Sequence, residues 1–143
     1  MHRKVAAALV AALALGVASC GGSEPLTRAQ LVRQLETACR QAQERAEEAG
    51  RSARGEGGFF EAVLAGQRVL VERVEGLEPP DELRDDVDTL ESGLAERTDL
   101  VAEVAQAGRA EQQRLMAEAT RRMETVTRDI DGALRRLGVE GCN

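Results

Sequence analysis

Leu77-Glu78-Pro79-Pro80-Asp81-Glu82-Leu83 is the stretch that decides the fold. The first of its two prolines biases the preceding residue away from the helical region of backbone space, and the second suits the first position of a new helix. The acidic pair Asp81 and Glu82 then lies where the positive end of that helix's dipole favours negative charge. The stretch therefore predicts the end of one helix and the start of the next.

On both sides of this break, apolar residues recur in steps of three and four, which is typical of amphipathic helices. Thr27 with Gln30 has the pattern of a capping box, so it predicts a helix start. We expect a glycine-rich loop at 51–58, and we expect Phe59 and Phe60 beyond it to pack against the alanines that end the first helix, because large against small residues fill the space. The predicted helices cover about 27–50, 58–77, 80–107 and 110–137.

Four such segments with short connections predict an all-α domain over residues 27–143, an antiparallel up-down-up-down four-helix bundle. Gly108 is the weakest joint, and the alternative is that helices three and four run on as one rod whose apolar stripe a second chain buries. Arg97 interrupts the third apolar stripe, and we expect its stem to lie along the core with its head in water.

The first twenty residues have the parts of a secretory signal: a cationic start at Arg3 and Lys4, an apolar run over 5–17 and a small-residue exit. A run of about 13 residues is short for a membrane-spanning helix, which needs about 20. A transmembrane anchor is therefore the weaker alternative. An ordinary cleaved signal is a second alternative.

The exit itself, Val17-Ala18-Ser19-Cys20, resembles the lipobox of bacterial lipoproteins. That resemblance implies that residues 1–19 are removed and that Cys20 takes a diacylglyceryl group through its sulfur. Residues 20–26 would then be a tether, and the domain would lie on the extracytoplasmic face of the cell membrane, held through its lipid anchor.

The chain has three cysteines, an odd number for an exported protein. If Cys20 carries lipid, Cys39 and Cys142 remain as one pair, and an oxidising exterior would keep it as a disulfide; two free thiols are the alternative. To reach Cys39, which is well inside the first helix, residues 139–142 must fold back along that helix, or the fourth helix must stop short. Because this bridge returns the chain's end to helix one, we expect a monomer.

Composition excludes several classes of function. Without Arg3 and Lys4 the chain keeps 17 basic against 25 acidic residues, a formal charge of −8, which disfavours nucleic acid as a partner. Phe59 and Phe60 are the only aromatic residues, so neither a base-stacking platform nor an aromatic sugar-binding shelf can be built.

No catalytic constellation stands out. The only histidine, His2, lies in the leader, which removes most zinc, haem and triad chemistry from the mature chain. Met116 and Met123 could suggest copper(I), but methionines at stripe positions more often fill a core. The acidic run over 81–88 lacks a calcium-loop glycine and is better interpreted as a solvated face. We therefore expect no enzyme activity, no metal and no cofactor.

The chain also resembles a loose group of small helical lipoproteins from actinobacteria. The resemblance depends on the lipobox at Cys20, on Ala38-Cys39-Arg40, on the Leu77-Glu78-Pro79-Pro80 turn and on the closing residues 137–142. It implies no functional residues. The resulting hypothesis is a non-enzymatic lipoprotein that interacts with an envelope protein; the alternative is a carrier that holds a lipid or another apolar small molecule between its helices.

Overall fold

We analysed a computed structural model, which describes residues 24–140 and 142. Every element of secondary structure in these residues is helical. The predicted all-α class is therefore confirmed, and helices three and four are separate. The elements are α1 (Arg28–Ser52), α2 (Gly55–Glu75), the short 3₁₀ helix η1 (Asp81–Leu83), α3 (Arg84–Arg109) and α4 (Gln113–Leu137).

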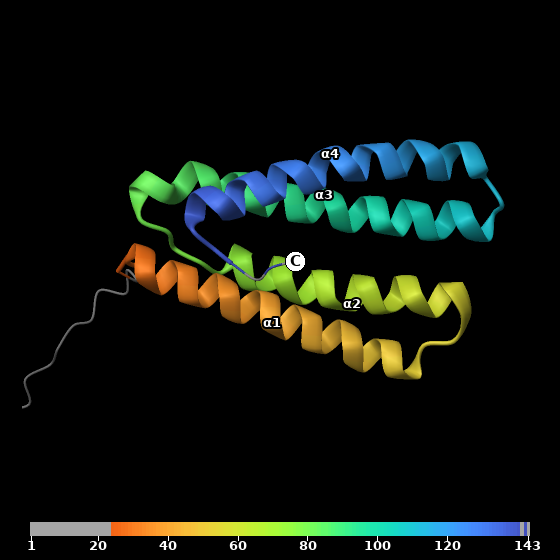
Figure 1. Cartoon of the computed structure of the whole chain (residues 1–143), viewed down its shortest axis with the longest axis horizontal. Coiled ribbons are helices and arrows are strands. Elements are labelled where there is room, and N and C mark those ends of the chain that lie inside the picture. Colours follow the sequence, from red (N-terminus) through yellow and green to blue (C-terminus); the bar gives the residue numbers. More distant parts are fainter. Residues whose placement is uncertain (1–23, 141, 143) are drawn as a thin grey trace, which may run out of the picture.

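Figure 1 shows how these helices are arranged. The start of α1 and the connection from α2 to α3 lie at one end, which we call the proximal end. The α1–α2 and α3–α4 loops lie at the other, the distal end. Close packing joins α1 to α2, α2 to α3 and α3 to α4, whereas α1 and α4 are not among the closely packed pairs.

The predicted capping box begins α1. The backbone N–H of Gln30 donates to Thr27 Oγ1 at 3.3 Å, and the Thr27 N–H donates to Gln30 Oε1 at 2.8 Å. Just before it, the Leu26 N–H donates to the carbonyl oxygen of Glu78 at 2.8 Å. The start of α1 is thereby joined to the proline turn that separates α2 from α3.

Arg136 connects three helices at the same end. Its Nε lies 2.6 Å from Asp86 Oδ1 of α3, while its carbonyl oxygen, at the end of α4, accepts a 2.8 Å hydrogen bond from Arg28 of α1. A guanidinium is favourable at a helix C-terminus because the last carbonyls have no partner within the helix. The proximal end is therefore closed by polar contacts that do not depend on the core.

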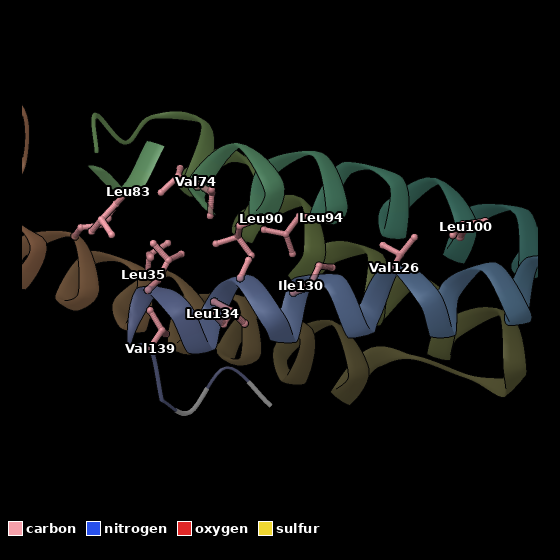
Figure 2. Close-up of a cluster of buried hydrophobic side chains, with 14 of the residues drawn as sticks. Leu35, Val74, Leu83, Leu90, Leu94, Leu100, Val126, Ile130, Leu134 and Val139 are labelled. Carbon is pink, nitrogen blue, oxygen red and sulfur yellow. The ribbon is translucent and has the colours of Figure 1, made fainter. Parts of the chain in front are cut away.

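Most of the large buried side chains labelled in Figure 2 gather in the proximal half of the bundle. There Leu35 of α1, Val74 of α2, Leu90 of α3 and Leu134 of α4 converge, and the exposed fraction of each is 9% or less. Toward the distal end, the buried residues of α1 and α2 are small, such as Ala42 and Ala62. Most large buried residues therefore lie in one half of the molecule.

The α1–α2 interface differs from the sequence expectation. Small residues face small residues: a Cβ added to Gly66 would lie 2.6 Å from the Ala42 carbonyl oxygen and 2.9 Å from the Ala46 Cβ. Phe59, predicted to fill this interface, is 62% exposed, and Phe60 is half-buried against the core. For Phe59 that prediction was wrong, because most of its ring surface stays in solvent.

The connection between α1 and α2 is also shorter than predicted. Only Ala53 and Arg54 separate the two helices, within the stretch 51–58 that was expected to be a loop. Gly55 takes a φ of 67°, in the left-handed region that favours glycine. Gly58 lets α2 approach Ala53 closely, since a Cβ added to Gly58 would lie 2.8 Å from the Ala53 Cβ.

Candidate functional site

The side of the bundle between α1 and α4 is bridged by the end of the chain. α4 ends at Leu137, Gly138 takes a left-handed φ of 83°, and the Val139 N–H donates to the Leu134 carbonyl oxygen at 2.9 Å. Val139 is buried, and Cys142 is bonded to Cys39 with their Cα atoms 5.3 Å apart. The tail therefore folds back along α1 as predicted, and the structure has the disulfide that the cysteine count predicts.

A groove opens beside this disulfide, toward the distal end. It has a volume of about 210 Å³. Its α1 side has the small residues Ala42 and Ala46, and its α2 side has Val63, Gly66 and Leu70. The close approach of the two backbones at Gly66 leaves no large side chain on the groove floor, so the hollow follows directly from the small-on-small interface.

Two polar side chains of unusual environment line the groove, Arg97 of α3 and Gln67 of α2. Arg97 Nε and Gln67 Oε1 are both buried, and neither has a hydrogen-bond partner in the part of the chain that the structure describes. A buried polar atom left unpaired costs about 1 to 3 kcal/mol. The protein behind the groove therefore holds a donor and an acceptor that the described residues do not satisfy.

Burial lowers the pKa of the Arg97 guanidinium below its usual value, and the charge of Asp131 on α4 opposes this effect. Over residues 24–140 and 142, no salt bridge includes Arg97. An arginine stays protonated even when burial lowers its pKa. Arg97 is therefore a partly buried cation with no salt bridge among the described residues, and the expectation that its head lies in water was wrong for Nε.

Arg97 and Gln67 were not proposed as site residues from sequence. Arg97 did give a signal, since it interrupts the apolar stripe of α3, but that position is equally consistent with an arginine whose head reaches solvent. Gln67 gave none. Only the way α1, α2 and α3 pack together decides that both residues line one groove.

Beneath the groove the interior is closed. An enclosed cavity of about 20 Å³, large enough for one water molecule, lies between Arg97, Asp131 and the disulfide. Sites for drug-sized ligands usually measure about 300 Å³ or more. This cavity is too small to hold a lipid.

Larger surface depressions exist, but polar side chains line them. One of them, of about 440 Å³ in the proximal half of the α1–α2 pair, includes Arg33 and Arg73 among glutamines. Both arginines are exposed, so water already solvates their charges. These depressions therefore lack the buried, unpaired polar atoms of the groove beside the disulfide.

Some of the features expected from the sequence lie outside the described residues, and others can be compared with the structure. Cys20, the signal segment 1–19 and most of the tether lie outside the described residues. Residues 24–140 and 142 contain no cluster of three or more His, Cys, Asp or Glu side chains suited to a metal ion. Within the same residues, no helix has the length and apolar character needed to span a membrane. Met123 packs against the core as the sequence suggested.

Comparison of the chain with family models, with curated proteins and with solved structures finds no match. Function must therefore be argued from the residues themselves.

Proposed function

We propose that this protein is a lipid-anchored, extracytoplasmic and non-enzymatic module that binds a protein partner in the cell envelope. Cys20 would be the lipidated residue after removal of residues 1–19. The helices would form an up-down-up-down antiparallel bundle, with both loops displayed away from the membrane. The Cys39–Cys142 disulfide supports this location, because such bonds persist in oxidising compartments.

The observation that carries the proposal is the position of the exposed apolar residues. Among the described residues, the large hydrophobic side chains classed as exposed are Phe59, at 62%, and Leu115, at 49%. Phe59 lies in the first turns of α2 and Leu115 in the first turn of α4, and both helices begin at the distal end (Figure 1). The tether from the lipidated Cys20 would join the bundle at its proximal end. The apolar side chains would therefore face away from the membrane, where a protein can reach them.

Site-specific crosslinking in intact membranes tests this proposal. A photoreactive residue at Phe59 or at Leu115 should capture one defined protein, whereas the same residue at the exposed proximal position Glu82 should not. Capture that is equal at all three positions, or no defined product from either distal position, would refute the distal docking surface.

A second experiment tests the anchor separately. Cys20→Ser should move the protein from the membrane to the soluble fraction without changing its melting temperature. A protein that stays with the membrane after this substitution would contradict lipidation at Cys20.

A further inference from the structure

We propose that the protein partner of the distal end docks in a groove between α3 and α4, beside Leu115, and presents there an aliphatic side chain next to a lysine or arginine. This inference rests on the proposed docking function and names the chemistry of the partner at that surface. All residues that line this α3–α4 groove belong to α3, to α4 or to the turn between them, at the distal end of the bundle (Figure 1).

The α3–α4 groove has a floor of small residues and an accessible rim. It measures about 350 Å³, within the range of about 300 to 1,000 Å³ that is usual for ligand sites. Ala107 of α3 and Ala119 of α4 are buried in its floor, whereas Leu115 on its rim is exposed. Because both floor residues are alanines, the surface between the helices stays hollow. An aliphatic side chain placed there would remove apolar surface from water.

The charges of the rim select a cation. Glu103 of α3 and Glu118 of α4 line the groove, and both side chains are exposed. One basic residue also lines it, Arg122, whose Nη2 lies 3.4 Å from Glu96 Oε1 and whose Nη1 lies 3.5 Å from Glu103 Oε2. Glu118 has no salt bridge among the described residues. These three carboxylates and one guanidinium leave a net of two negative charges beside an apolar side chain.

A second depression at the distal end provides no such selection. It lies at the α1–α2 loop, measures about 520 Å³ and is lined by two arginines and two glutamates, Arg45, Arg54, Glu48 and Glu61. Alanine, serine and glycine supply the rest of its lining. Its charges cancel, so it favours neither sign of partner. The α3–α4 groove, by contrast, combines an exposed leucine with an excess of negative charge.

The first test uses hexylammonium as the probe, since it joins an aliphatic chain to a cation. In an NMR titration of the purified, disulfide-bonded protein, hexylammonium should cause saturable amide shifts at Ala107, Leu115 and Ala119. Hexanoate should bind several-fold more weakly because the rim carboxylates repel it, and about 1 M salt should remove most of that difference. Equal binding of hexanoate at low salt, shifts centred on the acidic stretch 81–88, or no saturable shift would overturn the proposal.

Charge variants should move the affinity in opposite directions. Glu118→Lys should weaken hexylammonium binding about fivefold, because it replaces an attractive charge with a repulsive one. Arg122→Met should strengthen binding about two- to threefold, because it frees two carboxylates. Glu124→Lys and Arg121→Met are the matched controls, since both residues are exposed on α4 outside the groove, and they should change the affinity little. Weaker binding by Arg122→Met, or equal effects of Glu118→Lys and Glu124→Lys, would contradict the charge selection.

Crosslinking in intact membranes then connects the groove to the partner. A photoreactive residue at Gln112, which lines the groove, should capture the same protein as one at Leu115. Glu118→Lys should reduce this capture about fivefold, and Glu124→Lys should not. Capture that survives Glu118→Lys would disprove the charge selection and leave the docking function standing. If neither Phe59 nor Leu115 yields a product although hexylammonium binds as expected, the docking function fails, and a protein occupant of the groove fails with it.

Discussion

The close contact between α1 and α2 makes Gly66→Ala the most informative stability test. A Cβ at this position would lie 2.6 Å from the Ala42 carbonyl oxygen, and ordinary van der Waals contact begins at 3.4 Å, so the helices would have to separate by about 0.8 Å. Overpacking of this kind costs about 1 to 3 kcal/mol. Replacing a helical glycine with alanine returns about 1 kcal/mol of helix propensity. We therefore expect a net loss of about 0 to 2 kcal/mol in the free energy of unfolding.

Gly132→Ala is the matched control within α4. There the nearest atoms to the added Cβ are Arg136 Nη1 at 3.2 Å and Arg135 Nη2 at 4.0 Å, the ends of two flexible side chains that can move aside. Only the gain in helix propensity remains, so the free energy of unfolding should rise by about 0.5 to 1 kcal/mol.

Urea denaturation followed by far-ultraviolet circular dichroism measures both variants, since the chain has no Trp or Tyr for fluorescence. The two glycines should shift the unfolding midpoint in opposite directions. If Gly66→Ala stabilises the protein as much as Gly132→Ala does, the close α1–α2 contact does not exist in solution.

Three further predictions concern the disulfide, the buried cation and the α3–α4 turn. The bond between Cys39 and Cys142 spans 103 residues, so the double variant with serine at both positions should lose about 4 to 5 kcal/mol of stability. Reducing agent should then have no further effect on the melting temperature of this variant. A reductant effect on the double variant, or none on the wild type, would contradict this. Arg97→Met should leave the free energy of unfolding unchanged or raise it by about 1 kcal/mol, because it removes a poorly compensated buried charge. Folding lowers the Arg97 pKa, so the charged form opposes folding at every pH below that pKa. The gain in thermal melts should therefore be constant across the neutral range. Glu111 has a φ of 54°, a conformation that costs most L-residues about 1 to 2 kcal/mol. Glu111→Gly should therefore raise stability by roughly 0.5 to 1 kcal/mol in the same urea assay. A loss of stability would show instead that the Glu111 side chain stabilises the turn.

Local sequence signals were enough for the elements themselves. The proline pair after Glu78 separates α2 from α3, and the capping box at Thr27 begins α1, because both act on the few residues around them. The pairing of Cys39 with Cys142 also followed from the chain alone, given the lipobox, since it required only a count of the cysteines.

The arrangement of helix faces was not available from the same signals. Periodicity places Phe59 and Gly66 on one face of α2, but it cannot say which part of that face meets α1 and which part stays in water. The structure puts Gly66 at the contact with α1 and leaves the Phe59 ring, seven residues earlier on the same helix, exposed. The predicted packing of Phe59 against alanines failed because the pattern does not show where along that face α1 lies.

The sequence by itself determined the helical class, the helix boundaries to within a few residues, the redox pairing and the absence of histidine from everything after His2. Only the tertiary structure decided that Arg97 and Gln67 face the same groove, and that neither Nε nor Oε1 finds a partner there. The physical reason is range: helix formation and chain breaks depend on neighbours within about four residues, whereas a groove depends on how α1, α2 and α3 cross and on where the disulfide holds the tail.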